Sequence, residues 1–270
     1  MHLELEEGKI VQPGKVEPLD SVHKAAMAIG LTWIAGFVDI VGYIALKQIL
    51  NANMSGNTVL MPYHLFQQGP VGALARGLAV LMFVAGLIAC ACIHEGCIRR
   101  GVRSSAAVTL GMEALLILLF VLEGGRYVTA TAGFLMPRSV FYSLIALACG
   151  AMGLQNATLT RVGALTVRTT HVTGTLAKFA ESWSRYMFWF YDKTRGPREG
   201  RFREAFRLSL QHEDFKDAAI TAGLWVGFLL GALCGVWLLH LWLLNSLFLP
   251  IAMLLAFVAA DLKHPITARK

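Results

Sequence analysis

The chain alternates between long apolar stretches and short polar segments. Six of the apolar stretches have 17 to 22 residues, and about 20 residues of α-helix span the hydrocarbon core of a bilayer. Their apolar residues follow one another without the alternation of a half-buried strand, which favours helices. The pattern predicts an all-α membrane protein with six transmembrane helices, at residues 25–46, 73–93, 106–122, 140–159, 218–239 and 243–260.

Two further apolar runs are too short to cross a membrane. One covers residues 56–66, and a helix of this length is only ~16 Å long, about half of a bilayer core. The other begins at Gly174 and ends in a group of aromatic residues, as is typical of a membrane interface. We interpret both runs as re-entrant half-helices that enter the membrane and return to the same side.

The residues around these two short runs occur twice in the chain. The two copies are Gly36-Phe37-Val38-Asp39 with Asn53-Met54-Ser55-Gly56-Asn57-Thr58, and Gly153-Leu154-Gln155-Asn156 with Val172-Thr173-Gly174-Thr175. Gly56 lies 17 positions after Asp39, and Gly174 lies 18 positions after Asn156. A further match pairs residues 83–86 with 228–231. Internal repeats of this kind are common in transporters, so we predict two three-helix repeats.

The distribution of basic residues indicates that the two repeats are inverted. If both short runs crossed the membrane, the Arg-containing segments 99–103 and 161–168 would face outside, against the positive-inside rule. If both runs return, these segments and the basic segment 184–216 face the cytoplasm. We therefore expect a multi-pass membrane protein with both termini cytoplasmic. Its acidic start is unlike a secretory signal peptide.

This topology divides the chain into consecutive parts. We expect a cytoplasmic arm (residues 1–24), the first repeat (25–123), an external linker (124–139), the second repeat (140–262) and a cytoplasmic tail (263–270). The segment 184–216 contains eight Lys or Arg and five acidic residues. We interpret it as a cytoplasmic insertion in the second repeat.

The predicted half-helices place two helix N-termini near the middle of the membrane. A helix N-terminus has unpaired N–H groups and about half a positive charge, and non-helical backbone at this depth has to line protein or a water-filled cavity. Ser, Thr and Gly at these starts allow capping and close approach of a ligand. We expect a site for a small polar or anionic solute formed by Asp39, Asn53, Ser55, Gly56, Asn57, Gln155, Asn156, Thr173, Gly174 and Thr175.

Four titratable residues are candidates for proton coupling or gating. Asp39 lies deep in a predicted helix, where a carboxylate has to be paired, hydrated or protonated. Its alternative role is structural, as a neutral or Lys47-paired group that pins two helices. Glu113 offers the same chemistry, or holds its helix by a hydrogen bond. His64 and His171 are candidates for gating, with hydrogen-bonded packing as the alternative.

The remaining polar and small residues suggest packing rather than chemistry. The fifth predicted span carries small residues at four-residue spacing, at Gly223, Gly227, Gly231 and Gly235, a pattern that packs helices closely within a chain or at a homodimer interface. Cys90, Cys92, His94, Glu95 and Cys97 lie close together, but their spacing matches no zinc motif well. We therefore expect no metal and no other cofactor.

The composition agrees with a membrane protein. Hydrophobic residues make up 56% of the chain and charged residues 15%, whereas soluble domains contain about a quarter charged residues. The net charge is +7, but the basic residues lie between the apolar stretches, where they set membrane orientation. The charge therefore indicates a lipid bilayer rather than nucleic acid as the partner.

The repeated motifs resemble those of the YoaK-type (DUF1275) family of bacterial integral membrane proteins, a family of unknown function. The resemblance rests on residues 35–39 with 53–58 and on residues 150–157 with 172–176, and it covers residues 25–260. It implies an integral protein of the bacterial inner membrane with about six spans, and it supplies no substrate. The N-terminal arm and the basic insertion look like additions to the family pattern.

From these features we infer a transporter or channel for a small polar or anionic solute, not an enzyme. The layout is reminiscent of water channels, which also have three spans in each inverted half, although their Asn-Pro-Ala signatures are absent. One alternative is a non-transporting membrane partner or sensor that acts through residues 184–216. The other is an intramembrane enzyme using Asp39, His64 or His171, for which no nucleophile–base pair is evident.

Overall fold

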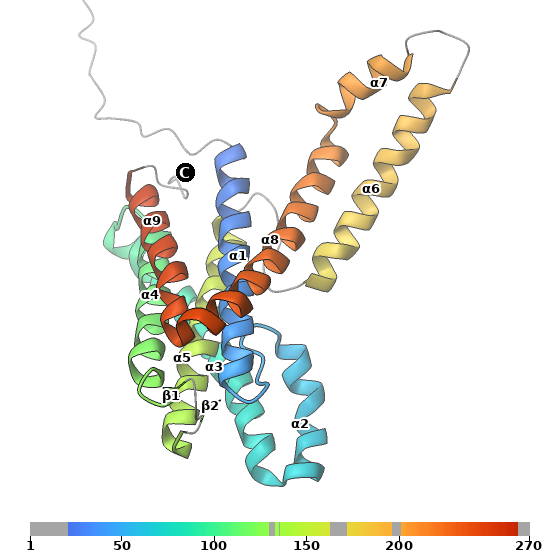
Figure 1. Ribbon diagram of the computed structural model, residues 1–270. Coiled ribbons are helices and arrows are strands. Elements are labelled where there is room, and N and C mark those ends of the chain that lie inside the picture. The colour runs from blue at the N-terminus through green and yellow to red at the C-terminus, as the bar shows by residue number, and fades with distance from the viewer. Residues whose placement is uncertain (1–20, 130–132, 135, 163–171, 196–200, 264–270) are drawn as a thin grey trace, which may run out of the picture.

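The computed structural model describes residues 21–129, 133–134, 136–162, 172–195 and 201–263. These residues are almost entirely helical (Figure 1). In chain order the elements are α1 (Ser21–Ala45), α2 (Met54–Gln68), α3 (Pro70–Arg100), α4 (Ser105–Gly124), β1 (Val128–Thr129), β2 (Gly133–Phe134), α5 (Arg138–Val162), α6 (Val172–Thr194), α7 (Arg201–Ser209), α8 (Glu213–Trp242), the 3₁₀ helix η1 (Leu243–Leu247) and α9 (Phe248–Lys263). The two-residue strands β1 and β2 pair antiparallel within the predicted linker.

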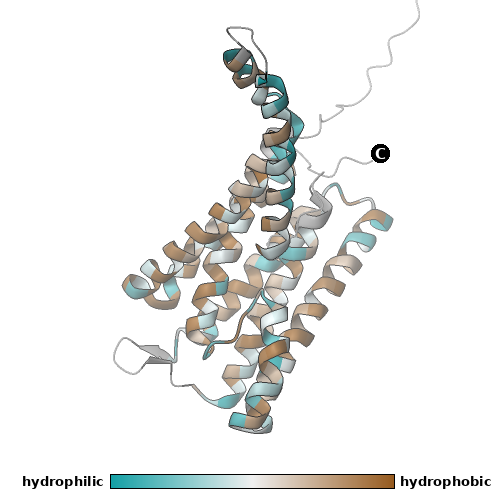
Figure 2. Ribbon diagram, turned by 90° about the vertical axis from the view of Figure 1, so that its right-hand side faces the viewer, coloured by the Kyte–Doolittle hydropathy of each residue, from teal (hydrophilic) through white to brown (hydrophobic). Residues whose placement is uncertain are grey.

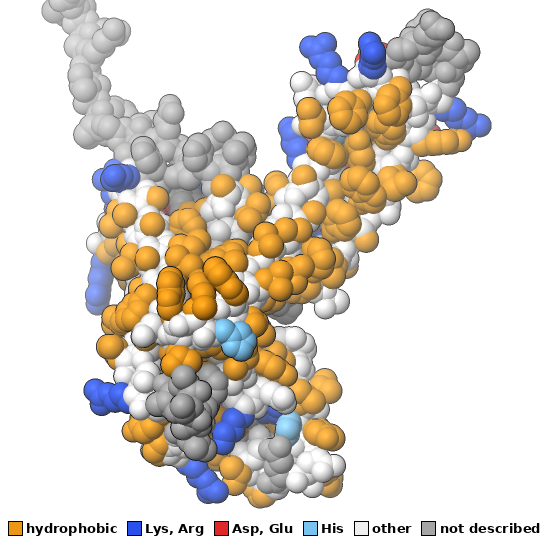
Figure 3. All heavy atoms as spheres, viewed as in Figure 1, with side chains coloured by type: hydrophobic (Ala, Val, Ile, Leu, Met, Phe, Trp, Pro, Cys, Tyr) orange, Lys and Arg blue, Asp and Glu red, His pale blue; other side chains and the backbone are white. Residues whose placement is uncertain are grey.

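Within the described part of the chain, five helical stretches are long and apolar enough to cross a membrane, at Lys24–Ala45, Pro70–Arg100, Ser105–Gly124, Arg138–Thr158 and Glu213–Lys263. The last stretch contains α8, η1 and α9. Hydrophobic side chains cover much of the outside of the bundle (Figure 3). Leu81, Leu119 and Leu233 are among the large ones that stay exposed. Helices that are apolar on their outer faces as well as their inner ones are typical of lipid contact. The chain is thus an all-α membrane protein.

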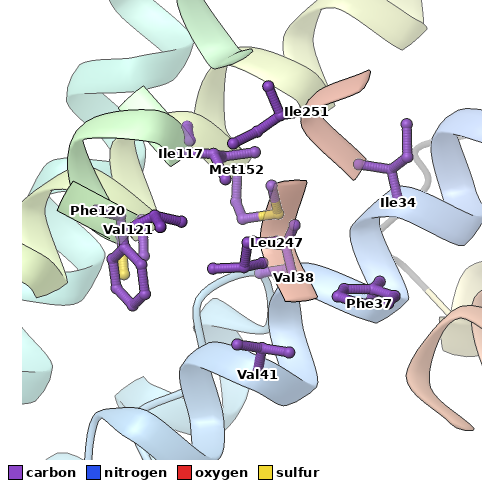
Figure 4. Packing of buried hydrophobic residues seen from close by; sticks show 14 of the residues in the cluster. Ile34, Phe37, Val38, Val41, Ile117, Phe120, Val121, Met152, Leu247 and Ile251 are labelled. Atoms are coloured by element: carbon purple, nitrogen blue, oxygen red, sulfur yellow. The ribbon is translucent and has the colours of Figure 1, made fainter. Parts of the chain in front are cut away.

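The hydrophobic core forms where α1, α4, α5, η1 and α9 meet (Figure 4). Phe37 and Val38 of α1, Ile117 of α4, Met152 of α5 and Leu247 of η1 are all buried there. These side chains come from both halves of the sequence, so the two halves share one core. The core fixes α1 against the rest of the bundle and thereby positions the end of α1 that leads to α2.

Helix α1 crosses α8 at a very short distance. A methyl group at Gly36 of α1 would lie 2.1 Å from the backbone oxygen of Phe228, and one at Gly231 of α8 would lie 2.0 Å from that of Trp33. Both distances are far below a van der Waals contact, so only glycine fits at either position. All four glycines of the stripe at 223, 227, 231 and 235 face α1 of the same chain.

Helices α3 and α5 cross in the same way. A methyl group at Gly153 of α5 would lie 2.2 Å from the backbone oxygen of Phe83, and one at Gly86 of α3 would lie 2.3 Å from that of Gly150. Trp33 and Gly36 precede Gly150 and Gly153 by 117 positions, and residues 83 and 86 precede 228 and 231 by 145. The same crossing therefore occurs twice, between residues that correspond in the sequence repeat.

Helices α2 and α6 start near the middle height of the bundle and run in opposite directions (Figure 1). Helix α2 has 15 residues, Met54–Gln68, and packs against α3. Helix α6 packs against α8 but has 23 residues, Val172–Thr194. The second apolar run is therefore much longer than the short half-helix predicted from the sequence. Polar residues interrupt its apolar pattern on the exposed side without ending the helix.

The outer parts of α6 and α8 project from the bundle with α7 as a helical hairpin, which is more hydrophilic than the bundle (Figure 2). Arg185 of α6 donates to Glu181 at 2.6 Å and to Asp214 of α8 at 2.9 Å. The predicted insertion 184–216 is thus continuous with its flanking helices. Exposed aromatic side chains remain on the hairpin, including Phe188 and Phe202.

The glycine crossing of α1 and α8 predicts a position-specific loss of stability. Gly36→Ala forces the two helices apart, and overpacking of this kind costs about 1–3 kcal/mol. Gly111→Ala in α4 is the matched control, because no atom lies within 4 Å of the added methyl group. We expect a lower thermal unfolding temperature in detergent for Gly36→Ala alone. Equal shifts in the two variants would contradict the crossing.

Candidate functional site

A partly open cavity of about 800 Å³ lies between the first half of the bundle and α8. Its size falls in the range of small-molecule sites. Helices α1, α2, α3 and α8 and the connector between α1 and α2 all contribute to its wall. The lining residues are Gly36, Asp39, Ile40, Tyr43, Gln48, Leu50, Leu60, Tyr63, His64, Gln67, Arg76, Phe228 and Ala232.

Arg76 is the buried cation of this cavity. Its side chain, on the second turn of α3, is 2% exposed. The guanidinium donates to the Asn57 side-chain oxygen at 3.1 Å, to the Gln48 carbonyl at 3.4 Å, and from Nη2 to His64 Nε2 at 2.8 Å. All these acceptors are uncharged. Each ion pair within 4 Å among the described residues has Arg99, Arg185 or His212 as its basic member. Arg76 therefore has no carboxylate partner among these residues.

Asp39 holds the connector rather than a basic side chain. Its Oδ1 atom accepts the backbone N–H groups of Asn51 at 2.8 Å and Ala52 at 2.9 Å. The predicted alternative of pairing with Lys47 is wrong, because the Lys47 ammonium lies over the Phe141 ring at 5.7 Å. Asp39 is 8% exposed and lines the cavity. The carboxylate therefore fixes non-helical backbone next to the cavity.

Two asparagines complete the bonding of the connector. Asn51 donates its side-chain amide to the Val38 carbonyl at 3.2 Å. Asn57 donates to the Leu50 carbonyl at 2.6 Å and accepts the Leu50 N–H at 3.3 Å. The same Asn57 oxygen accepts from Arg76, so the connector and the cation are held by one side chain.

The turn that follows α1 has an unusual backbone. Lys47 and Gln48 have φ angles of 52° and 66°, and non-glycine residues in this region carry a cost of order 1–3 kcal/mol each. The turn places the Gln48 carbonyl against the guanidinium of Arg76. Strain of this kind is found at functional sites, where neighbouring contacts maintain it.

The start of α2 differs slightly from the prediction. The helix begins at Met54, and Asn53 is its N-cap, with Oδ1 accepting from the Gly56 N–H at 3.3 Å and from Ser55 Oγ at 2.7 Å. Ser55 thus bonds to the cap and does not form it. Asn53, Ser55 and Gly56 do not line the cavity. Of the predicted solute-binding residues, Asp39 lines it, and Asn57 contacts its cation.

The residues predicted from the second repeat do not join this cavity. Gln155 donates to the Leu31 carbonyl of α1 at 3.0 Å and ties α5 to α1. Asn156 is buried, and its side-chain oxygen has no hydrogen-bond partner among the described residues. On α6, Thr175 is buried, whereas Thr173 and Gly174 are exposed.

The other proposed gating residues lie apart from one another. His64 lines the cavity. Glu113 is fully buried in α4, and neither carboxylate oxygen has a hydrogen-bond partner in the part of the chain that the structure describes. It does not line the cavity. His171 lies outside the described residues. No group of three His, Cys, Asp or Glu with metal-binding geometry occurs among the described residues.

Arg76 is the cavity residue that the sequence analysis did not identify as a candidate. It lies near the start of the predicted span 73–93, a place where a long basic side chain commonly reaches the membrane surface. A helical projection of residues 54–68 contains the missing signal. Asn57, His64 and Gln67 lie seven and three positions apart, so they share one face of α2. A polar face on a helix at membrane depth indicates a buried polar partner.

The bonding of Asp39 predicts different effects for two substitutions. Asp39→Ala leaves the N–H groups of Asn51 and Ala52 without an acceptor, at a cost of about 1–3 kcal/mol. Asp39→Asn keeps a side-chain oxygen at the same place. We expect hydrogen exchange of the connector, residues 46–53, to accelerate strongly in the Ala variant and little in the Asn variant. Equal acceleration in both would mean that the charge, not the acceptor, holds the connector.

The chain has detectable relatives among known proteins. The family model described as "Protein of unknown function (DUF1275)" matches residues 27–260. The UPF0700 transmembrane protein YoaK of Bacillus subtilis (strain 168) is 29% identical over 155 residues, which make up 57% of this chain and 64% of that protein. The match thus spans less than two thirds of that relative. No solved structure matches the chain. Because the family model covers most of the sequence, the chain belongs to the DUF1275 family of membrane proteins.

Proposed function

We propose that this protein is a transporter or channel for a small anionic solute, which binds in the cavity at Arg76. The observation that carries the proposal is a buried guanidinium without a carboxylate partner among the described residues, facing a cavity of about 800 Å³. A buried charge is costly unless it is paired. Ionisable residues at membrane depth commonly mark solute pathways.

The charges around the cavity favour an anion as the solute. Asp39 lines the same wall, but its Oδ1 atom is engaged by two backbone amides. Arg76 is bonded only to neutral acceptors, so its positive charge remains uncompensated by a direct contact. A guanidinium presents five N–H donors in a planar fork that suits oxyanions.

We further propose six spans in two inverted three-helix repeats. The spans are α1, α3 and α4 in one repeat and α5, α8 and α9 in the other. The matching glycine crossings support this arrangement, as do the opposite directions of α2 and α6 (Figure 1). In this scheme α2 is a re-entrant half-helix. Helix α6 starts as its counterpart and then continues out of the membrane into the hairpin.

The orientation is proposed from the basic residues. Helix α1 begins and α9 ends at the same end of the bundle as the hairpin (Figure 1). The hairpin carries Arg203 and Arg207 among other cations, and the turn between α3 and α4 carries Arg103. The positive-inside rule then places this end in the cytoplasm of a bacterium, with the lipid bilayer as the partner.

We also propose that the protein moves its solute without changing it. Among the described residues, no Ser, Thr or Cys lines the cavity, so no aliphatic hydroxyl or thiol nucleophile is found in that part of its wall. The second candidate function is that of a membrane partner or sensor. Exposed Phe188 and Phe202 on the projecting hairpin favour it.

Removing the charge of Arg76 tests the transport proposal. We expect purified protein in liposomes to take up radiolabelled anions, screened from chloride to pyruvate, and to exclude neutral glycerol. Arg76→Gln should lower the anion flux at least ~10-fold, because one lost charge-assisted contact is worth about 1.5–3 kcal/mol. Arg138→Gln, which alters an exposed arginine, is the matched control.

A folding defect is separated from a binding defect by a second variant. Arg76→Lys keeps the charge but loses the planar fork, so it should retain anion selectivity with weaker flux. Thermal unfolding of each variant reports whether the bundle is intact. Flux equal to that of protein-free liposomes, or flux unchanged in a folded Arg76→Gln variant, would refute the proposal.

A further inference from the structure

One contact in the cavity fixes the protonation state of a histidine. Arg76 Nη2 and His64 Nε2 lie 2.8 Å apart. A guanidinium can only donate hydrogen bonds, so Nε2 of His64 has to be the acceptor. The imidazole is therefore neutral in this structure, and its hydrogen is on Nδ1. Nδ1 is buried and has no hydrogen-bond partner among the described residues.

A proton on His64 is incompatible with this contact. Protonation of Nε2 would place an N–H against the N–H of Arg76 and would bring two positive charges to hydrogen-bond distance. The pair then has to separate or to accept an anion between its members. In either case Nη2 of Arg76 becomes available to a ligand, and the cavity gains a second cation.

We propose that His64 and Arg76 form a proton-operated latch for an organic monocarboxylate, so that proton and anion enter the cavity together. This inference rests on the proposed anion transport. The proton binds to Nε2 of His64, the carboxylate binds to the guanidinium, and no covalent bond is formed or broken. Proton and monoanion together carry no net charge, so they enter without adding charge to a buried site.

The wall of the cavity indicates what the ligand carries besides its anionic group. Arg76 and His64 lie in a polar part of the wall that also includes Asp39, Gln48 and Gln67. Apolar side chains form the other part, from Ile40, Leu50, Leu60, Phe228 and Ala232. A carboxylate suits the planar fork of the arginine, and a hydrocarbon chain suits the apolar part of the wall. A purely inorganic anion would leave this wall without contacts.

Among the titratable groups around the cavity, His64 is the one that takes up the proton. From α1 the cavity receives Asp39 and Tyr43, from α2 Tyr63, and from α8 no titratable side chain. Asp39 is held by the connector amides. The Tyr63 ring stands edge-on to the imidazole, with ring centroids 5.3 Å apart. Histidine is the side chain whose charge changes most readily near neutral pH.

The test measures binding of radiolabelled ketoisocaproate to the purified protein at about pH 5.5 and about pH 7.5, on either side of the range where histidine titrates. Ketoisocaproate stays anionic at both values, so a change in affinity reports on the protein. We expect at least ~10-fold tighter binding at the lower pH. Pyruvate, which lacks the branched chain, should bind more weakly at both.

Two variants distinguish the pH response of the latch from anion binding itself. His64→Gln keeps an oxygen that accepts from Arg76 but cannot take a proton, so its affinity should stay at the alkaline value at both pH values. His240→Gln alters an exposed histidine of α8 and should respond to pH as the unmodified protein does. Thermal unfolding of His64→Gln establishes that the variant is folded.

Each outcome has a distinct meaning. A folded His64→Gln variant that still binds more tightly at low pH would overturn the latch, while Arg76-dependent flux would stand. Equal binding of ketoisocaproate and pyruvate, or binding of inorganic anions alone, would overturn the monocarboxylate assignment. If liposomes containing the unmodified protein showed no anion flux, the transport proposal on which the latch rests would be overturned instead.

Discussion

Non-helical backbone inside a membrane bundle has to find all its hydrogen-bond partners within the protein. The connector between α1 and α2 is such a segment, and Asp39 supplies the acceptor for two consecutive amides in it. Asn57 satisfies Leu50 in the same segment. The strained turn at Gln48 is stable only because these contacts surround it, and it carries the carbonyl that binds Arg76. The cavity therefore depends on how the connector is tied down.

The roles of the two charged residues follow from this constraint. The sequence makes Asp39 a candidate for proton coupling because it lies deep in a predicted helix. Hydrogen bonds from backbone amides explain its position in the structure. This role needs a hydrogen-bond acceptor and no change of protonation state. His64 is bonded to a cation and has an unused ring nitrogen. A bistable hydrogen bond is a better basis for coupling than a carboxylate that two amides already engage.

The long helices were predictable from the sequence because uninterrupted apolar stretches have few alternatives in a membrane. The closest approaches of α1 to α8 and of α3 to α5 fall in the repeated segments, but the repeat did not predict which helices cross there. The length of α6 was not predictable from hydropathy, because Lys178, Glu181 and Arg185 interrupt the apolar pattern but not the helix. Arg76 was missed because the burial of a side chain depends on what packs against it. Here a polar face of α2 packs against it, and the average hydropathy of that segment does not reveal this face.

The glycine crossings have a mechanical consequence. At the crossing points of α1 with α8 and of α3 with α5, backbone lies directly on backbone, so no side chain there can yield when one of the helices moves. Each pair is a stiff unit, and α2 rests on the second through its packing on α3. The cavity wall combines residues of α1 and α8 with residues of α2 and α3, so it lies on the seam between the units. Rocking of one pair against the other would change the shape of the cavity while leaving both crossings intact.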